Sequence, residues 1–213
     1  MARKLIEAVC TTNNCRSPLV ELIGRNHLVE IGAEGEYGII SSGTMANAMF
    51  DEEYSSDERH ELYRLAFKRG GVYNQSDKAA LEIAQITGGM HGLFNHLFSK
   101  AEAAFMADGK RYIAECIEKY GIKGSVKDGK DQTVPRFDVI AVLPVDKENY
   151  ARVSKMYSGI EYDPTISVLS QLATGDSKSE IKKVLGKGKN AYLDMVEQML
   201  REVPEAVNRI VGA

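Results

Sequence analysis

Residues 9–18 read Val9-Cys10-Thr11-Thr12-Asn13-Asn14-Cys15-Arg16-Ser17-Pro18 and place five residues between a cysteine and an arginine. Consecutive backbone N–H groups in such a loop, those of residues 11–16, can curl around an oxyanion without any side-chain charge. Arg16 would close the ring with its forked guanidinium group. Cys10, at the base of the loop, would lie in a strongly positive field, which favours the nucleophilic thiolate. The stretch therefore predicts a phosphate-binding loop that carries a nucleophile.

The residues on either side fit a strand, a loop and a helix in that order. Residues 4–9 read as a short strand, and Ser17 followed by Pro18 is a helix cap with a first-turn proline. Apolar residues then recur at helical spacing, so we expect a first helix that ends near Gly32. A strand that leads through a loop into a helix N-terminus is the local structure that an anion-binding loop requires.

The quoted stretch resembles the signature of the low-molecular-weight protein tyrosine phosphatases, a Cys-x-x-Asn-x-Cys-Arg-Ser-Pro loop directly after the first strand. The resemblance implies that Cys10 is the nucleophile, Arg16 the phosphate clamp and Ser17 a hydroxyl that stabilises the thiolate. It also implies that Asn13 fixes the loop conformation. Thr12 stands where the family usually has glycine, and a β-branched residue is poorly suited to a positive φ, so we expect a slightly remodelled loop. The implied phosphate-binding residues are Thr11, Thr12, Asn13, Asn14, Cys15, Arg16 and Ser17.

A second strand is expected over Tyr37–Ile40, and it runs into Ser41-Ser42-Gly43-Thr44. Serine and glycine are typical of a turn at the end of a strand. The family has a similar Ser-x-Gly-Thr turn after its second strand. The resemblance implies that Ser41 supports the phosphate loop by a hydrogen bond to the loop asparagine.

The chain leaves the family pattern from residue 45 to about residue 109. Serine caps, apolar residues at helical spacing and glycine stops predict helices there, so we expect an all-helical insertion over residues 45–109. His91 and His96 lie five positions apart, off the register for two ligands on one helix face, so we expect no metal site. Two roles stay open for the insertion, a lid over the pocket and the surface of a homodimer.

The family pattern returns after the insertion. Residues 111–120 are expected to form a helix, and the apolar run Val139–Leu143 predicts a parallel strand covered on both faces. A helix follows from Asp146, and an amphipathic helix over residues 190–211 closes the chain. The order predicts an α/β fold, a three-layer sandwich with a central parallel sheet of about four strands. The whole chain, residues 1–213, would form a single domain around this sheet.

The leaving oxygen of a phosphate ester should be protonated as its bond to phosphorus breaks. The family supplies an aspartate from a loop before the final helix, normally followed by proline. Asp163 belongs to the only Asp-Pro pair in the chain and follows a possible strand. Asp176 has the better spacing to the final helix but lacks the proline. We treat the two aspartates as alternatives for one general acid.

Composition excludes several classes of protein. The net charge of −3 and the pI near 5.9 argue against a general nucleic-acid binder. No apolar run approaches the roughly 20 residues of a membrane span, and Met1 leads directly into a strand rather than a signal peptide. Three cysteines, an odd number, indicate reduced thiols rather than a disulfide framework. We therefore expect a cytoplasmic protein.

The resemblance implies a phosphomonoesterase that acts through a cysteinyl-phosphate intermediate, takes a phosphoester as its ligand and needs no cofactor. Two alternatives stay open. A non-catalytic phosphate-binding or regulatory protein of the same fold would keep the loop without hydrolysis. A thioredoxin-coupled arsenate reductase would use the same loop but needs two further cysteines in a flexible segment, whereas Cys116 is the only cysteine outside the loop.

Overall fold

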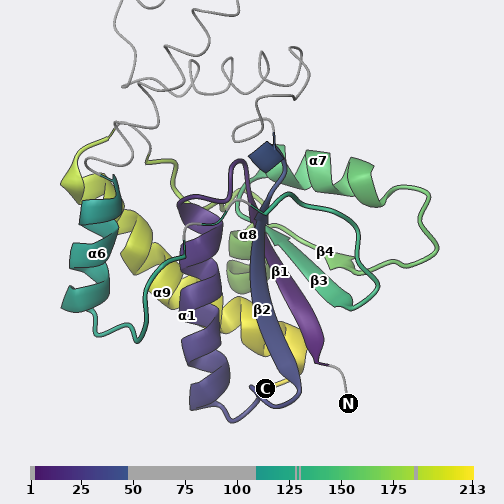
Figure 1. Cartoon of the computed structure of the whole chain (residues 1–213), viewed down its shortest axis with the longest axis horizontal. Helices are drawn as coiled ribbons and strands as arrows, with labels where there is room; N and C mark the ends of the chain where they lie inside the picture. Colours follow the sequence, from purple (N-terminus) through teal and green to yellow (C-terminus); the bar gives the residue numbers. More distant parts are fainter. Residues whose placement is uncertain (1–2, 48–108, 128, 130, 185–186) are drawn as a thin grey trace, which may run out of the picture.

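A four-stranded parallel sheet forms the centre of the protein (Figure 1). The strand order is β2-β1-β3-β4. The computed structural model describes residues 3–47, 109–127, 129, 131–184 and 187–213. The strands are β1 (Lys4–Cys10), β2 (Tyr37–Gly43), β3 (Val139–Pro144) and β4 (Thr165–Ile166). The helices are α1 (Arg16–Glu30), α6 (Lys110–Lys119), α7 (Lys147–Tyr157), α8 (Leu169–Thr174) and α9 (Lys189–Val211).

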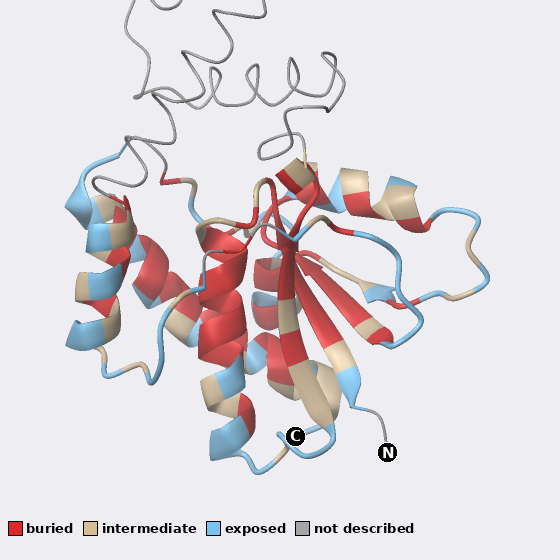
Figure 2. Ribbon diagram, in the orientation of Figure 1, coloured by how far each residue is buried: buried red, intermediate tan, exposed pale blue. Residues whose placement is uncertain are grey.

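Helices cover both faces of the sheet, and the buried residues lie where helices and sheet meet (Figures 1 and 2). Successive residues of a strand point to opposite faces. Ile6 and Ala8 of β1 accordingly join one buried cluster with α1, α6, α8 and α9, whereas Val9 joins a second cluster with Val153 and Tyr157 of α7. The three layers confirm the predicted α/β sandwich.

The carboxyl ends of the strands meet at one edge of the sheet. Cys10 pairs with Gly43, and Val9 pairs with Pro144, so the loops after β1, β2 and β3 all begin at this edge. Open parallel sheets bind ligands in the crevice outside the carboxyl ends of their strands. The predicted phosphate loop therefore lies where the fold provides a site.

Three elements differ from the sequence predictions. Helix α1 begins at Arg16, and no side chain caps it, because the hydroxyl of Ser17, the predicted cap, is used inside the loop. Strand β4 follows the Asp163-Pro164 pair rather than preceding it. The short helix α8 was not anticipated, since its six residues carry too little periodicity to be recognised.

The predicted helical insertion, residues 45–109, falls almost entirely on residues 48–108, which lie outside the described part of the chain. Its helices, its proposed roles and the histidines His91 and His96 therefore stay predictions. Among the residues that the structure describes, no helix is both long enough and apolar enough to cross a membrane.

Candidate active site

Cys10 ends β1 and lies at the base of the loop, with 3% of its surface exposed. The hydroxyl of Ser17, in the first turn of α1, lies 3.0 Å from the Cys10 sulfur. It is also 3.0 Å from Asn13 Oδ1 and 3.0 Å from the carbonyl oxygen of Ser42. Ser17 therefore holds the sulfur, the loop and the end of β2 together. When its proton points at sulfur, it stabilises a thiolate by a charge-assisted hydrogen bond.

Asn13 adopts a left-handed backbone conformation, with φ of 53°. Asparagine tolerates this region better than most residues because its short polar side chain can bond locally. Thr12, which stands in place of the family's glycine, does not have a positive φ among the described residues. The loop thus places its left-handed residue at Asn13 rather than at Thr12.

Ser41 contacts the loop through its backbone rather than its side chain. Asn13 donates from Nδ2 to the Ser41 carbonyl oxygen at 3.2 Å. The Ser41 hydroxyl instead donates to the buried carboxylate of Glu21 at 2.6 Å. Glu21 also pairs with Arg25 and Lys127, at 2.5 and 3.1 Å. The predicted contact between Ser41 and the loop asparagine exists, but any residue at position 41 could supply its carbonyl.

Two glycines let neighbouring backbone approach the loop. A Cβ on Gly43 would lie 2.7 Å from the Asn13 nitrogen and 2.8 Å from the Thr12 carbonyl carbon. A Cβ on Gly129 would lie 2.4 Å from the Asn13 carbonyl oxygen. All three distances are shorter than real Cβ contacts. The end of β2 and the segment around Gly129 therefore confine Asn13 from two directions.

Arg16 forms a buried ion pair with Asp146, with 2.7 Å between Nη1 and Oδ2. Their side chains are 8% and 0% exposed. Asp146 lies two residues after the end of β3 and caps α7, since its Oδ1 accepts from both the backbone and the side-chain nitrogen of Asn149, at 2.9 and 2.8 Å. Asn149 in turn accepts a hydrogen bond from Thr44, after β2. The guanidinium is thus fixed by an element 130 residues away in the chain.

Arg16 and Asp146 each stabilise the ionised form of the other. Burial alone would raise the pKa of Asp146, but Arg16 and the Asn149 backbone outweigh it and lower the pKa to about 2. Burial likewise opposes the charge of Arg16, yet Asp146 and Cys10 hold its pKa above the ordinary value. Burial raises the pKa of the Cys15 thiol to about 12, so Cys15 stays protonated. Of the two thiols in the loop, Cys10 is therefore the candidate nucleophile.

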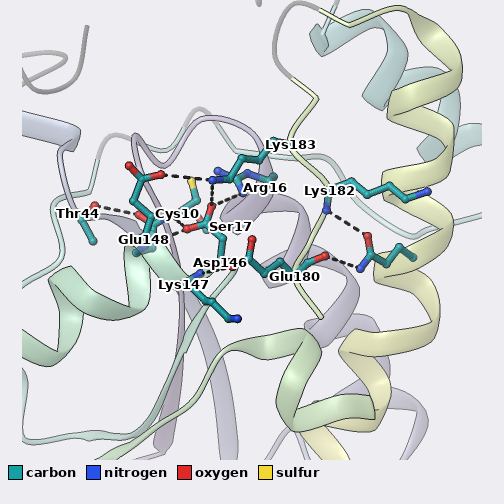
Figure 3. A network of polar contacts seen from close by, with 12 residues as sticks. Cys10, Arg16, Ser17, Thr44, Asp146, Lys147, Glu148, Glu180, Lys182 and Lys183 are labelled. Carbon is teal, nitrogen blue, oxygen red and sulfur yellow. Dashed lines mark hydrogen bonds and ion pairs between the residues drawn. The ribbon is translucent and has the colours of Figure 1, made fainter. Parts of the chain in front are cut away.

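The loop between α8 and α9 brings Lys183 to the same ion pair (Figure 3). Its Nζ lies 3.9 Å from Asp146 Oδ2, the oxygen that Arg16 contacts, and 3.3 Å from Glu148 Oε2 in the first turn of α7. The side chain of Lys183 is 36% exposed, against 8% for Arg16. Two cations and two carboxylates therefore alternate from the buried loop outward to solvent.

The comparisons with known proteins identify the fold. No protein-family model matches the chain, and no curated protein matches it. A protein tyrosine phosphatase from Entamoeba histolytica is 13% identical, with a TM-score of 0.59 over 98% of this chain and 97% of that one. A low-molecular-weight phosphotyrosine phosphatase from Vibrio cholerae O395 is 14% identical, with a TM-score of 0.54 over 98% and 95%. YwlE from Bacillus subtilis is 12% identical, with a TM-score of 0.56 over 97% and 98%.

The protein has the low-molecular-weight protein tyrosine phosphatase fold. In this phosphatase fold, the structure brings Cys10, Asn13, Arg16 and Ser17 together as the sequence predicted. Asp146 was not singled out as a site residue. Its place, two residues beyond the apolar run of β3 at the carboxyl edge of the sheet, was the available signal.

Asp163 lies towards the end of the sheet that is opposite to the carboxyl ends of the strands. It is exposed and comes two residues before Thr165, which pairs with Ala141, the partner of Ile6. Cys10 stands four residues further along β1 than Ile6. At the rise of a β-strand, about six residue steps separate Asp163 from Cys10, roughly 20 Å along the strands. The structure does not bring Asp163 to the phosphate loop.

Asp176 follows the end of α8 and is exposed. Its Oδ1 accepts from the backbone nitrogen of Lys178 at 2.9 Å, and its own nitrogen donates to Thr174 Oγ1. These contacts form a local turn. Within the described residues, no hydrogen bond or ion pair links Asp176 to Cys10 or Arg16. In the described part of the chain, no group of His, Cys, Asp and Glu residues could hold a metal ion either.

Proposed function

We propose that the protein is a phosphomonoesterase that acts through a cysteinyl-phosphate intermediate. The observation that carries this proposal is the contact of Ser17 with the Cys10 sulfur beside a guanidinium that Asp146 holds in place. A buried thiol, a hydroxyl that can stabilise its thiolate and a fixed cation are the parts that nucleophilic attack on a phosphate requires. The neighbours of the same fold named as phosphatases support the assignment.

The proposed reaction has two steps. The Cys10 thiolate attacks phosphorus while Arg16 and the backbone N–H groups of residues 11–16 bind the three remaining oxygens. Because Asp146 already fixes the guanidinium, binding costs little reorganisation. Water then hydrolyses the cysteinyl phosphate and restores the thiolate. All three cysteines of the chain are free, as this chemistry needs, and we propose a reducing, cytoplasmic location.

The substrate class is either an aryl phosphate or a phosphoarginine. Two of the neighbours are named as tyrosine phosphatases. A third, YwlE, is named as an arginine phosphatase. Their common fold supports both classes equally. We therefore propose to compare turnover of phosphotyrosine with turnover of phosphoarginine on the same enzyme preparation.

A non-catalytic phosphate-binding protein is the second candidate. It is favoured by the positions of Asp163 and Asp176, neither of which contacts the loop within the described residues. An arsenate reductase is disfavoured, because Cys116 lies in α6 with 1% of its surface exposed and cannot relay a disulfide. Arsenate turnover that depends on thioredoxin would reverse that judgement.

Substitution of Cys10 by serine tests the proposal. We expect wild-type protein to hydrolyse an aryl phosphate, vanadate to inhibit it, and Cys10→Ser to lose turnover by a factor of about 10⁴ or more, because serine is not ionised at neutral pH. Cys116→Ser, which changes a cysteine away from the loop, should keep turnover. Phosphate binding that survives Cys10→Ser, with no turnover by wild-type protein, would instead support the non-catalytic protein.

A further inference from the structure

The direction of attack decides where a proton donor must lie. The Cys10 sulfur is at the buried base of the loop, and in-line displacement places the leaving oxygen on the opposite side of phosphorus. That side points away from the sheet. A group that protonates the leaving oxygen must therefore approach from the side opposite Cys10 rather than from the sheet.

Lys183 is a second cation beside this loop. The backbone of its loop is tied to the end of β3, because the Ile181 nitrogen donates to the Val145 carbonyl oxygen at 3.0 Å. Lys183 Nζ then shares Asp146 Oδ2 with Arg16, so the ammonium and guanidinium groups are neighbours on one carboxylate oxygen. Lys183 is the more exposed of the two, and both side chains belong to one polar network (Figure 3).

Each of the nearby carboxylates is already engaged in a contact. Asp146 is fully buried, and its pKa of about 2 keeps it ionised, so it has no proton to give. Glu180 Oε1 accepts the backbone N–H of Lys147 at the start of α7, at 3.0 Å. Glu148 Oε2 lies 3.3 Å from Lys183 Nζ and so forms an ion pair with the ammonium group itself.

We propose that Lys183 is the proton donor to the leaving oxygen, in the place that the family gives to an aspartate. The inference rests on the proposed phosphatase function. Glu148 is a positioning residue in this scheme, because its contact holds the ammonium beside the loop. Lys183 also belongs to the loop before the final helix, α9, which is the region where the sequence led us to look for an acid.

The proton and electron counts balance over the two steps. In the first, a Cys10 sulfur electron pair forms the S–P bond, the P–O bond breaks with its electrons on the leaving oxygen, and the Lys183 ammonium gives that oxygen one proton. In the second, the neutral amine takes a proton from water, whose oxygen bonds to phosphorus as the S–P electrons return to sulfur. The products are an alcohol or phenol and inorganic phosphate, with both residues regenerated.

A series of leaving groups tests the role directly. For Lys183→Met, we expect kcat/KM on phenyl phosphate to fall by about 10²–10³-fold, and on 2,4-dinitrophenyl phosphate by less than about threefold, because the dinitrophenolate leaves without a proton. Lys183→Arg keeps the positive charge but does not release its proton, so it should lose phenyl phosphate turnover as Lys183→Met does. The matched control is Lys182→Met. Lys182 is the preceding residue, and its side chain pairs with Asp194 at 3.2 Å instead.

Three outcomes would overturn the inference. An equal loss on both substrates would make Lys183 a binding residue, and rescue of phenyl phosphate turnover by Lys183→Arg would make its charge, not its proton, the active feature. A loss confined to phenyl phosphate that is larger in Glu148→Gln than in Lys183→Met would assign the donor to Glu148. Failure of the phosphatase proposal is separate, because wild-type protein would then not hydrolyse even the dinitrophenyl ester.

Discussion

The ion pair with Asp146 fixes the Arg16 guanidinium beside the loop before any ligand binds. A buried charge without a partner costs several kcal/mol, and here each residue is the other's partner. Asp146 accepts a hydrogen bond from Nη1 of the guanidinium group. In the proposed reaction, the other N–H groups of Arg16 can bind the phosphate. The site thus depends on a carboxylate that does no chemistry itself.

Substitution of Asp146 by asparagine tests this dependence. We expect Asp146→Asn to lower the free energy of unfolding at neutral pH by about 3–5 kcal/mol, because the Arg16 charge stays buried without a counter-charge. Urea denaturation of both proteins measures the difference. Asp194→Asn is the matched control, since Asp194 pairs with Lys182 on the surface, and its effect should stay within about 0.5 kcal/mol.

The same variant should show a defined pH dependence. The folded pKa of Asp146, about 2, lies below the ordinary value of 3.8, so folding favours its ionised form. That contribution is complete above about pH 4 and is lost as the pH falls through about 2. The stability difference between wild type and Asp146→Asn should therefore shrink by about 2 kcal/mol across this window. A difference that stays constant down to pH 2 would contradict the ion pair.

The sequence identifies those site residues that are neighbours in the chain. Cys10, Arg16 and Ser17 lie within eight positions, and local spacing is enough to predict their meeting. Asp146 and Lys183 reach the site only because parallel strands end at one edge and a later loop returns to it. Such contacts depend on strand order, which local patterns do not determine.

The residues that follow β2 hold the loop by backbone hydrogen bonds. Thr44 and Met45 donate backbone hydrogen bonds to the carbonyl oxygens of Cys10 and Thr11, at 2.9 and 2.8 Å. Gly43, at the end of β2, lies against the same turn, and a side chain at position 43 would not fit. The loop is thus held through its carbonyl groups, whereas the proposed function uses its N–H groups.

Substitution of Gly43 by alanine should move the loop. Its added methyl group would meet backbone atoms of Asn13 and Thr12 at 2.7 and 2.8 Å, and backbone cannot turn aside as a flexible side chain can. We expect vanadate affinity to fall roughly tenfold or more, because small misplacements at a reacting centre are costly. Inhibition of aryl phosphate hydrolysis by vanadate measures the loss.

Gly35→Ala is the control for this substitution, because its Cβ would meet no atom within 4 Å. Unchanged vanadate inhibition in Gly43→Ala would mean that the end of β2 does not set the loop conformation.

The sequence predicts the boundaries of β3 from its apolar run and those of α9 from apolar spacing sustained over 23 residues. It does not predict those of β4, since two paired residues give no periodicity to recognise.

At the scale of the whole molecule, stability and site come from different parts of the structure. Helix α9 contributes several fully buried side chains to the cluster beneath α1 and the sheet, among them Met195, Met199 and Val203. The site lies at the edge of the sheet, beyond this core. The apolar spacing of α9 predicted its buried face, but the order of the strands that it covers comes only from the structure.

Met199→Ala tests this separation. The side chain is fully buried, so its loss should lower the free energy of unfolding by about 2–5 kcal/mol. At temperatures where the variant stays folded, vanadate affinity should match that of wild type. Arg201→Ala, on the exposed side of the same helix, should change stability by less than about 0.5 kcal/mol. A loss of vanadate affinity in folded Met199→Ala would show that core and site are coupled.

The segment that follows α6 has a consequence for solubility. Strand β2 lies at the edge of the sheet, and unpaired edge strands are templates for aggregation between molecules. At its carboxyl end, Gly43 donates to the Asp131 carbonyl oxygen and accepts from the Thr133 nitrogen, at 2.8 and 2.9 Å. The backbone beside the phosphate loop is therefore already occupied. Substitutions that release residues 131–133 would expose this edge and promote self-association of otherwise folded protein.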